Sequence, residues 1–144
     1  MAALLDVNVL VALFDPEHIH HEAAHDWFAV SSGSGWATCP LSENGLIRVL
    51  SNPGYPGRHT TIHDASDRLS TFCRGSEHVF WEDCVSVRDD KRFQTKHIQG
   101  YRQLTDVYLL GLAVEHDGWL ATFDRGVPVA SVTGAKSSHL RVIL

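Results

Sequence analysis

The sequence predicts a single α/β domain over residues 1–144, with a mainly parallel central sheet flanked by helices on both faces. The first observation behind this prediction is that short apolar runs alternate with longer runs of helical periodicity, as in parallel sheets with crossover helices. The second is the composition, because 44% hydrophobic and 20% charged residues are typical of a globular protein. The third is the length, because 144 residues make one ordinary domain and no repeat or long linker divides them.

In the N-terminal half, apolar spacing predicts the helices and turn formers separate them. Asp15 and Pro16 end the first helical segment, and the Pro and Gly residues of 51–57 make a loop. The next helix has an apolar face formed by Ile19, Ala23, Trp27 and Val30, flanked by Ala24 and Phe28. The expected elements are a strand at 3–5, a helical segment at 8–14, a helix at 17–31, a strand at 36–39, a helix that Ser42 caps and that continues through Leu50, and a helix at 62–72.

The C-terminal half continues the alternation. Thr105 is the expected N-cap of a helix at 106–116, which is apolar nearly all round and is therefore expected to be buried. Asp117 and Gly118 end that helix, and Gly100 ends a polar helix before it. The expected elements are strands at 79–81 and 84–87, a polar helix at about 89–99, the helix at 106–116, and strands at 119–123 and 140–144.

Composition and charge exclude several functional classes. The net charge is −5, from 12 Lys and Arg against 17 Asp and Glu, so broad positive charge cannot by itself attract a nucleic acid. Three cysteines, Cys39, Cys73 and Cys84, are an odd number without CxxC spacing, which indicates reduced thiols rather than a disulfide framework or a zinc knuckle. The apolar run at 107–114 is much shorter than the roughly 20 residues that span a bilayer, and residues 1–14 lack the basic start of a signal peptide. We therefore expect a soluble, cytoplasmic protein.

Four acidic residues stand at the ends of expected elements. Asp6 and Asp124 each follow a strand, Glu43 lies at a strand-to-helix junction, and Asp106 opens the buried helix. Because ligands of an open parallel sheet bind at the carboxyl ends of its strands, we expect the four carboxylates to converge on one crevice. Two like charges about 4 Å apart repel by roughly 4 kcal/mol at an effective dielectric of 20, so such a cluster needs Mg²⁺, Mn²⁺ or a raised pKa. This chemistry suits metal-assisted hydrolysis of a phosphodiester.

Three strings of the sequence, LLDVNVLVALF at 4–14, SENGLIRVL at 42–50 and LTDVYLLGLAVEHDGWLATFDRG at 104–126, occur in the order typical of one family. They resemble the PIN-domain ribonucleases, specifically the VapC-type toxins of toxin–antitoxin pairs. The first and last strings are the more specific. Val107 departs from the alanine that usually follows the third acid, and His116–Asp117 makes a more polar turn than is usual.

The resemblance implies a PIN fold and an endoribonuclease that depends on Mg²⁺ or Mn²⁺ and leaves 5′-phosphate and 3′-hydroxyl ends. The metal-binding and catalytic acids implied are Asp6, Glu43, Asp106 and Asp124, supported by Asn8, Thr105 and Thr122. Arg125 lies beside the last acid, and this position makes it a candidate contact to the RNA backbone. The implied partners are an RNA substrate, a cognate antitoxin protein and a second copy in a homodimer.

A rival interpretation rests on histidines. Residues 21–25, HEAAH, match the HExxH pattern of zinc metalloproteases. At 100° per residue, His18, His21, Glu22 and His25 fall opposite the apolar arc of their helix, so we expect them to face solvent or a partner rather than a cleft. The group of His18, His20, His21 and His25 could also bind a metal or titrate together near pH 6.5, and the sequence assigns it no catalytic role.

Two further alternatives concern the acidic crevice itself. Asp6-Val7-Asn8 could be read as a phosphatase nucleophile loop, but that loop needs a second acid where Asn8 stands. The crevice could also be catalytically inert, which would leave a module that only binds RNA or a protein partner. An RNA cleavage assay with and without EDTA separates the last alternative from an enzyme.

Overall fold

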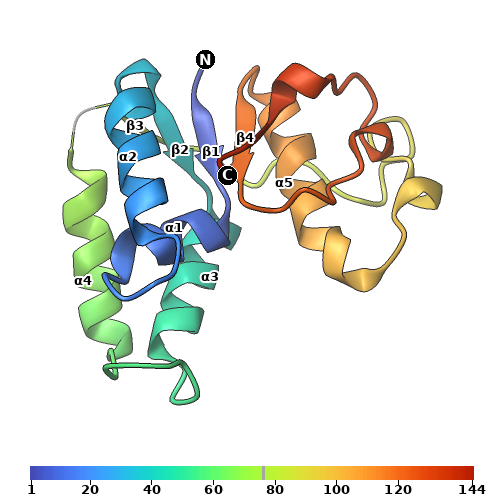
Figure 1. Ribbon diagram of the computed structural model, residues 1–144. Helices are drawn as coiled ribbons and strands as arrows, with labels where there is room; N and C mark the ends of the chain where they lie inside the picture. Colours follow the sequence, from blue (N-terminus) through green and yellow to red (C-terminus); the bar gives the residue numbers. More distant parts are fainter. Residues whose placement is uncertain (76) are drawn as a thin grey trace.

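The computed structural model describes residues 1–75 and 77–144 as a parallel sheet with helices on both faces (Figure 1). The strands are β1 (Ala3–Leu5), β2 (Trp36–Thr38), β3 (His78–Phe80), β4 (Trp119–Thr122) and β5 (Leu140–Val142). Their order is β3-β2-β1-β4-β5, and every neighbouring pair is parallel. The chain therefore winds outward in both directions from β1, and the crevice beyond the carboxyl ends of β1 and β4 is a topological switch point. The predicted fold class is confirmed.

The helices divide into two layers. One face of the sheet, called here the four-helix face, is covered by α1 (Val7–Phe14), α2 (His21–Ser31), α3 (Pro40–Ser51) and α4 (Ile62–Cys73). The other, the α5 face, is covered by α5 (Leu104–Glu115) and the irregular segments around it (Figure 1). Successive strand residues alternate between the layers, since Leu5 packs in the four-helix face and Leu4 in the α5 face.

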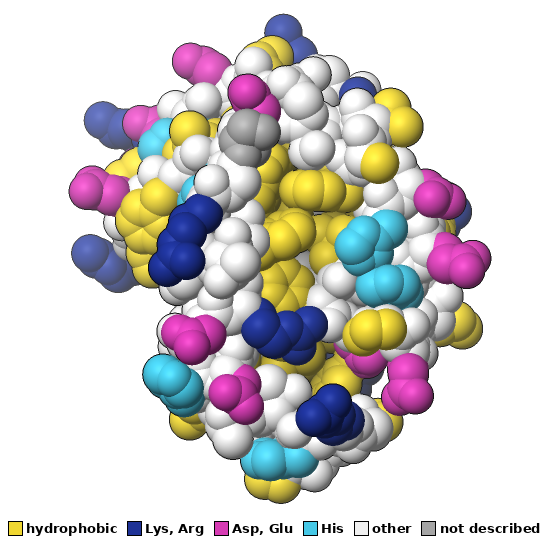
Figure 2. Space-filling model, turned by 90° about the vertical axis from the view of Figure 1, so that its left-hand side faces the viewer, with side chains coloured by type: hydrophobic (Ala, Val, Ile, Leu, Met, Phe, Trp, Pro, Cys, Tyr) yellow, Lys and Arg dark blue, Asp and Glu magenta, His cyan; other side chains and the backbone are white. Residues whose placement is uncertain are grey.

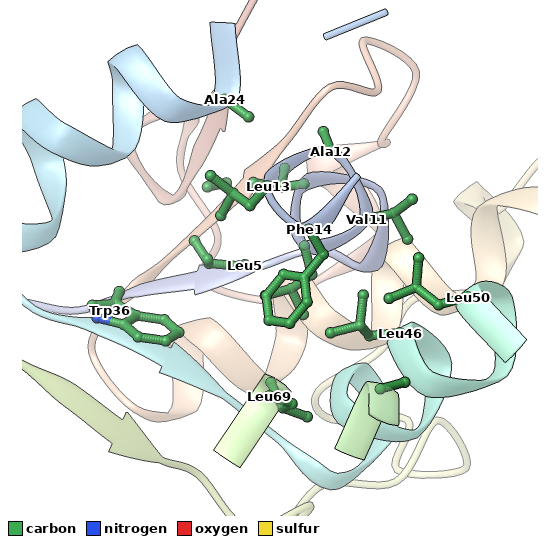
Figure 3. Packing of buried hydrophobic residues seen from close by; sticks show 14 of the residues in the cluster. Leu5, Val11, Ala12, Leu13, Phe14, Ala24, Trp36, Leu46, Leu50 and Leu69 are labelled. Carbon is green, nitrogen blue, oxygen red and sulfur yellow. The ribbon is translucent and has the colours of Figure 1, made fainter. Parts of the chain in front are cut away.

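Aromatic and aliphatic side chains fill the four-helix face (Figure 3). The side chain of Trp36 is 2% exposed and lies among Phe28 and Phe72, and the ring of Phe14 meets that of Phe72 edge to face with centroids 5.1 Å apart. Such edge-to-face pairs are a preferred aromatic geometry. This packing fixes α1 and α4 relative to the end of β2.

The α5 face is built around the helix that the sequence predicts to be buried. Val107, Leu109, Leu110 and Leu112 are fully buried, which confirms that prediction. A Cβ atom at Gly111 would lie 2.4 Å from the Phe93 ring, so only glycine permits this close approach. No helix of the described residues is both long and apolar enough to cross a membrane.

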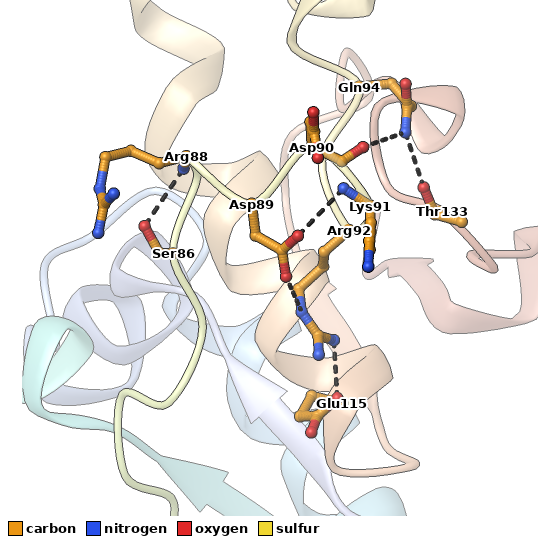
Figure 4. A network of polar contacts seen from close by, with 9 residues as sticks. All are labelled: Ser86, Arg88, Asp89, Asp90, Lys91, Arg92, Gln94, Glu115 and Thr133. Carbon is orange, nitrogen blue, oxygen red and sulfur yellow. Dashed lines mark hydrogen bonds and ion pairs between the residues drawn. The ribbon is translucent and has the colours of Figure 1, made fainter.

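Residues 84–99 differ from the prediction, because neither the strand at 84–87 nor the polar helix at 89–99 is present. The segment instead forms turns and one short 3-10 helix, Thr95–His97. Its polar side chains bind nearby groups: Arg92 pairs with Glu115 at 2.7 Å, and Gln94 donates to Thr133 at 3.0 Å (Figure 4). Phe93 is the anchor, since it is buried and forms an isolated bridge with Val132. One deeply buried apolar residue with satisfied polar neighbours favours turns over an amphipathic helix.

Helix boundaries also depart from the sequence. The helix expected at 17–31 begins at His21, because turns occupy the residues after Asp15, and Ile19 and Val30 of its expected apolar face are 87% and 85% exposed. Ala24 is its buried residue. Gln103, not Thr105, is the N-cap of α5.

The cap of α3 differs from the prediction as well. Its N-cap is Cys39, not Ser42. Ser42 instead completes a capping box, in which its Oγ accepts a hydrogen bond from the Cys39 backbone N–H at 3.0 Å.

Candidate active site

The carboxyl ends of β1 and β4 bring Asp6 next to Thr122. Asp6 directly follows β1 and is 4% exposed, and its backbone N–H donates to the carbonyl of Ala121 at 3.0 Å. The Thr122 hydroxyl donates to Asp6 Oδ2 at 2.7 Å. A buried carboxylate is costly unless it is hydrogen-bonded or close to a cation, and a single hydroxyl only partly satisfies it. Burial accordingly raises the pKa of Asp6, and the charge of Asp124 adds to this rise.

Asp106 lies between Asp6 and Asp124. It belongs to the first turn of α5 and is half-buried, and its carboxyl group is close enough to those of both other aspartates to interact with them. Burial, and next the charge of Asp6, raise the pKa of Asp106 to about 8. At neutral pH the metal-free group therefore holds a proton that carboxyl groups normally lose, and a divalent cation could take that proton's place.

Thr122 connects the remaining groups of the site. Its hydroxyl accepts the backbone N–H of Asp124 at 3.0 Å while it donates to Asp6. Asn8 lies beside it, with its Nδ2 atom 3.5 Å from Thr122 Oγ1 and its Oδ1 atom 3.5 Å from the backbone nitrogen of Phe123. Asp124 also accepts the backbone N–H of Gly126 at 2.7 Å through Oδ1. One side-chain hydroxyl thus orients two of the three aspartates.

Glu43 does not join the aspartates in the structure, although the sequence predicts four converging acids. It lies in the first turn of α3, where Thr38 Oγ1 donates to its Oε2 atom at 2.6 Å. Its neighbours are Cys73 and His78, and the interactions of the described residues that shift the pKa values of Asp6 and Asp106 do not include Glu43. The reason is strand alternation, because Thr38 shares its side of β2 with Trp36 and therefore lies on the four-helix face.

Thr105 and Arg125, the other two predicted site residues, are both exposed. Thr105 makes no side-chain hydrogen bond within residues 1–75 and 77–144, although it adjoins Asp106 in α5. Arg125 follows Asp124 and donates from Nη2 to the carbonyl of Leu144 at 2.5 Å. Arg125 is therefore placed beside the last aspartate, with part of its guanidinium group bound to backbone.

The histidines of the HExxH pattern contact α1 at one edge of each ring, and His25 is exposed, as predicted, whereas His21 is half-buried. His21 Nδ1 lies 2.7 Å from the carbonyl of Ala12, and His25 Nε2 lies 3.0 Å from that of Leu13. These carbonyl groups belong to the last turn of α1. Carbonyl groups at the end of a helix lack partners within the helix, so they can accept hydrogen bonds from imidazole N–H groups. The nitrogen that donates to a carbonyl has no lone pair for a metal, but the other ring nitrogen keeps one. Within residues 1–75 and 77–144, however, no group of three side chains with metal-binding spacing includes His21 or His25, which argues against the protease interpretation.

Sequence reasoning missed three residues around Glu43, namely Thr38, Cys73 and His78. Two signals were present: a Cys-x4-His spacing at 73–78, and a threonine that ends β2 as Thr122 ends β4. Neither signal is specific without the fold, because the residues come from three separate elements.

Residues 3–132 match the PIN domain, which is most of the chain. The chain belongs to the PIN-domain family. Its relatives include Ribonuclease VapC44 of Mycobacterium tuberculosis, which is 42% identical over 143 residues that cover 99% of this chain and 100% of the relative. Ribonuclease VapC38 of the same organism is 46% identical over 125 residues, which cover 87% and 86% of the two chains. The resemblance of this PIN domain to the VapC-type ribonucleases is therefore confirmed.

A solved structure supports the PIN fold independently. The crystal structure of Mycobacterium tuberculosis VapC20, described as a sarcin–ricin loop cleaving toxin, superposes with a TM-score of 0.63. The match covers 92% of this PIN domain and 97% of VapC20 at 9% sequence identity, so it bears on the fold alone. In this PIN domain the three aspartates lie at the carboxyl edge of the sheet, beside β1 and β4.

Proposed function

We propose that this PIN domain is a Mg²⁺- or Mn²⁺-dependent endoribonuclease and the toxin of a VapBC-type toxin–antitoxin pair. The observation that carries the proposal is the convergence of Asp6, Asp106 and Asp124 at the carboxyl edge of the sheet, where burial, and next the charge of a neighbouring aspartate, raises the pKa values of Asp6 and Asp106. Oxygen ligands alone suit a hard divalent cation that shares substrate phosphates. The proposal includes a cytoplasmic location, where an RNA substrate is available.

The three aspartates would hold the cation, which supplies charge neutralisation and activates a water for attack on the phosphate. Thr122 keeps Asp6 and the backbone of Asp124 in position through its 2.7 Å and 3.0 Å hydrogen bonds. Asp106 must lose its proton before it can act as a ligand, so binding of the cation is coupled to proton release. Asn8 lies against Thr122 and limits its movement.

Glu43, Thr105 and Arg125 complete the proposed site through the family resemblance. Glu43 lies at the same carboxyl edge of the sheet, and it would have to leave Thr38 to become a fourth acid. Thr105 adjoins Asp106 and is free to meet the substrate side of the site. Arg125 is exposed beside Asp124, where a cation suits an RNA phosphate.

A groove on the face of the molecule shown in Figure 2 supports the proposal of an antitoxin partner. The groove has a volume of about 590 Å³ and lies between the end of α1, His25 of α2 and the C-terminal half of α4. Apolar side chains line its hollow with cationic and histidine side chains beside them (Figure 2). Its lining includes Leu13, Phe14, Phe72, His25, Arg68 and Arg74. This mixture suits an antitoxin segment that carries both apolar and acidic residues, and Arg74→Glu should weaken its binding in calorimetry.

Incubation of RNA with the purified protein tests the function directly. We expect internal cleavage in Mg²⁺ or Mn²⁺, no cleavage in EDTA, and restoration when the cation is added back. Mapping the products should find 5′-phosphate and 3′-hydroxyl ends. Cleavage that persists in EDTA, or cyclic phosphate ends, would contradict a metal-dependent mechanism. RNA binding without cleavage would instead favour the inert-module alternative, and the same incubation with a homogeneous protein substrate tests for protease activity.

A further inference from the structure

Glu43, Cys73 and His78 form a compact group on the four-helix face. They come from the first turn of α3, the last residue of α4 and the first residue of β3, and each is half-buried. A carboxylate oxygen, the thiol sulfur and an imidazole nitrogen all lie within 4.8 Å of one another. The packing of α3 against α4 and the pairing of β3 with β2 fix the three backbones.

The Thr38 hydroxyl holds these side chains together. It donates to Glu43 Oε2 at 2.6 Å and lies 2.8 Å from His78 Nε2, and the Cys73 thiol is close enough to interact with it. Because the hydroxyl gives its single proton to Glu43, His78 must donate from Nε2, which fixes the tautomer of the metal-free protein. The His78 ring also packs on Trp36, with centroids 4.5 Å apart, so its orientation is restricted before any ion arrives.

The donor set has the chemistry of a zinc site. Zn²⁺ binds thiolate and imidazole ligands, whereas Mg²⁺ prefers oxygen ligands. A carboxylate completes many zinc sites. Ligand atoms about 2.0–2.3 Å from a tetrahedral ion lie roughly 3.3–3.8 Å apart, so a contraction from within 4.8 Å is small. One carboxylate and one thiolate also balance the charge of one divalent cation.

We propose that Glu43, Cys73 and His78, with Glu43 held at Thr38 as the structure shows it, bind one Zn²⁺ ion at a site separate from the three aspartates, with the fourth position open to water. While this ion is bound, Glu43 does not serve as a fourth acid for the aspartates. Binding removes the Cys73 thiol proton, which is released to solvent, and shifts the His78 proton from Nε2 to Nδ1. One proton therefore leaves for each ion bound below the thiol pKa. Burial, with the Glu43 charge, raises the pKa of Cys73 to about 11, so the metal-free thiol is protonated and zinc affinity rises with pH.

Titration with Co²⁺, a spectroscopic substitute for Zn²⁺, tests the site on the full chain. We expect a thiolate-to-cobalt charge-transfer band that saturates at one equivalent and disappears when Zn²⁺ is added. Asp6→Asn should keep the band, because aspartates contribute no thiolate. Cys73→Ser should abolish it. Cys84→Ser is the matched control and should keep it, although Cys84 Sγ lies 3.7 Å from His116 Nε2.

Absence of the band in the wild-type protein, or its survival in Cys73→Ser, would overturn the proposal. Loss of the band in Cys84→Ser would show that the band comes from Cys84 rather than Cys73, and this result would also overturn the proposal. If Cys73→Ser does not fold, alkylation of the wild-type protein gives the answer by mass spectrometry. Zn²⁺ should slow alkylation of Cys73 and leave that of the exposed Cys84 unchanged. Equal rates for Cys73 with and without Zn²⁺ would reject the site.

Discussion

Two acidic groups stand at the same edge of the sheet and are built in the same way on opposite faces. A threonine ends β4 and donates to Asp6 at 2.7 Å, and another threonine ends β2 and donates to Glu43 at 2.6 Å. On the α5 face the further neighbours are Asp106 and Asp124, whereas on the four-helix face they are Cys73 and His78. The hydroxyl positions the acid in both cases, and the neighbours decide the chemistry.

The consequences for charge differ accordingly. Burial, together with repulsion among the three carboxyl groups, raises the pKa values of Asp6 and Asp106, so this group favours a bound proton on Asp106 or a bound cation. In the second group a single carboxylate faces a thiol and an imidazole, and burial lowers the pKa of His78 while the Glu43 charge opposes that shift. The first group therefore suits a hard cation and phosphate chemistry, and the second suits a softer cation held by a neutral imidazole.

Asp6→Asn is expected to have the largest effect on RNA cleavage. The amide keeps the shape and the Thr122 contact but loses the charge that binds the cation. Metal catalysis supplies several kcal/mol, so we expect a loss of roughly 100- to 1000-fold in the cleavage rate, measured with saturating Mg²⁺. The midpoint temperature of thermal unfolding in EDTA should be unchanged or slightly higher than in the wild-type protein, because a buried carboxyl group is removed. Wild-type cleavage by Asp6→Asn would exclude the aspartate site as the catalytic one.

Thr122→Val and Thr38→Val form a matched pair that separates the two groups. Partners that orient metal ligands are worth about 10- to 100-fold in metal affinity or activity, so Thr122→Val should lower cleavage by that amount. Thr38→Val removes the same kind of hydrogen bond on the other face, and should leave cleavage within about 3-fold. Mg²⁺ titration of the cleavage rate measures both. Equal losses in the two variants would mean that the two faces act as one site.

The fold and most of the aspartate group were predictable because they rest on local patterns. Asp6, Asp106 and Asp124 sit where a strand ends or a helix begins, and strand ends meet at one edge of a parallel sheet. Glu43 also follows a strand, yet its side chain lies on the four-helix face, because the Thr38 hydroxyl donates a hydrogen bond to it there. That choice depends on contacts among α3, α4 and β3, which no local pattern encodes.

The errors share one physical origin, since tertiary contacts overrode local periodicity. The polar segment at 89–99 looked amphipathic, but one buried residue, Phe93, and ion pairing by Arg92 hold it in turns. The helical wheel placed His21 toward solvent, but His21 is half-buried because its ring hydrogen-bonds with the free carbonyl of Ala12 in α1. In each case the decisive partner is distant in sequence or is a backbone group.

Glu43→Gln tests whether the second acid enters the first site. Glu43 must break its hydrogen bond with Thr38 to reach the aspartates, and this rearrangement reduces what Glu43 can contribute to binding of the catalytic cation. We therefore expect Glu43→Gln to lower the cleavage rate by about 10-fold. Cleavage as slow as in Asp6→Asn would show that Glu43 binds the catalytic cation fully. Unchanged cleavage would limit Glu43 to the Cys73–His78 group, and the comparison of the two faces would then be complete.

The smallest expected effect is the pH dependence of stability without metal, which Asp106 should dominate. The pKa of Asp106 is raised from an ordinary value near 3.8 to about 8, so between these values the folded protein binds more protons than the unfolded chain. In EDTA the free energy of unfolding should therefore fall as pH rises from about 5 to about 8, by at most about 1.4 kcal/mol per pH unit for one proton. Partial exposure of the carboxyl group reduces this slope.

Urea unfolding at several pH values, in EDTA and in Mg²⁺, measures this slope. Asp106→Asn should flatten it because the amide does not titrate, while the raised pKa of Asp6 leaves a residual slope of the same sign. Saturating Mg²⁺ should oppose the slope in the wild-type protein, because the ion binds the ionised carboxylates of the folded state. A wild-type slope that Asp106→Asn leaves unchanged would mean that the aspartates do not share a proton. The excess charge on the α5 face would then have to be neutralised by other groups.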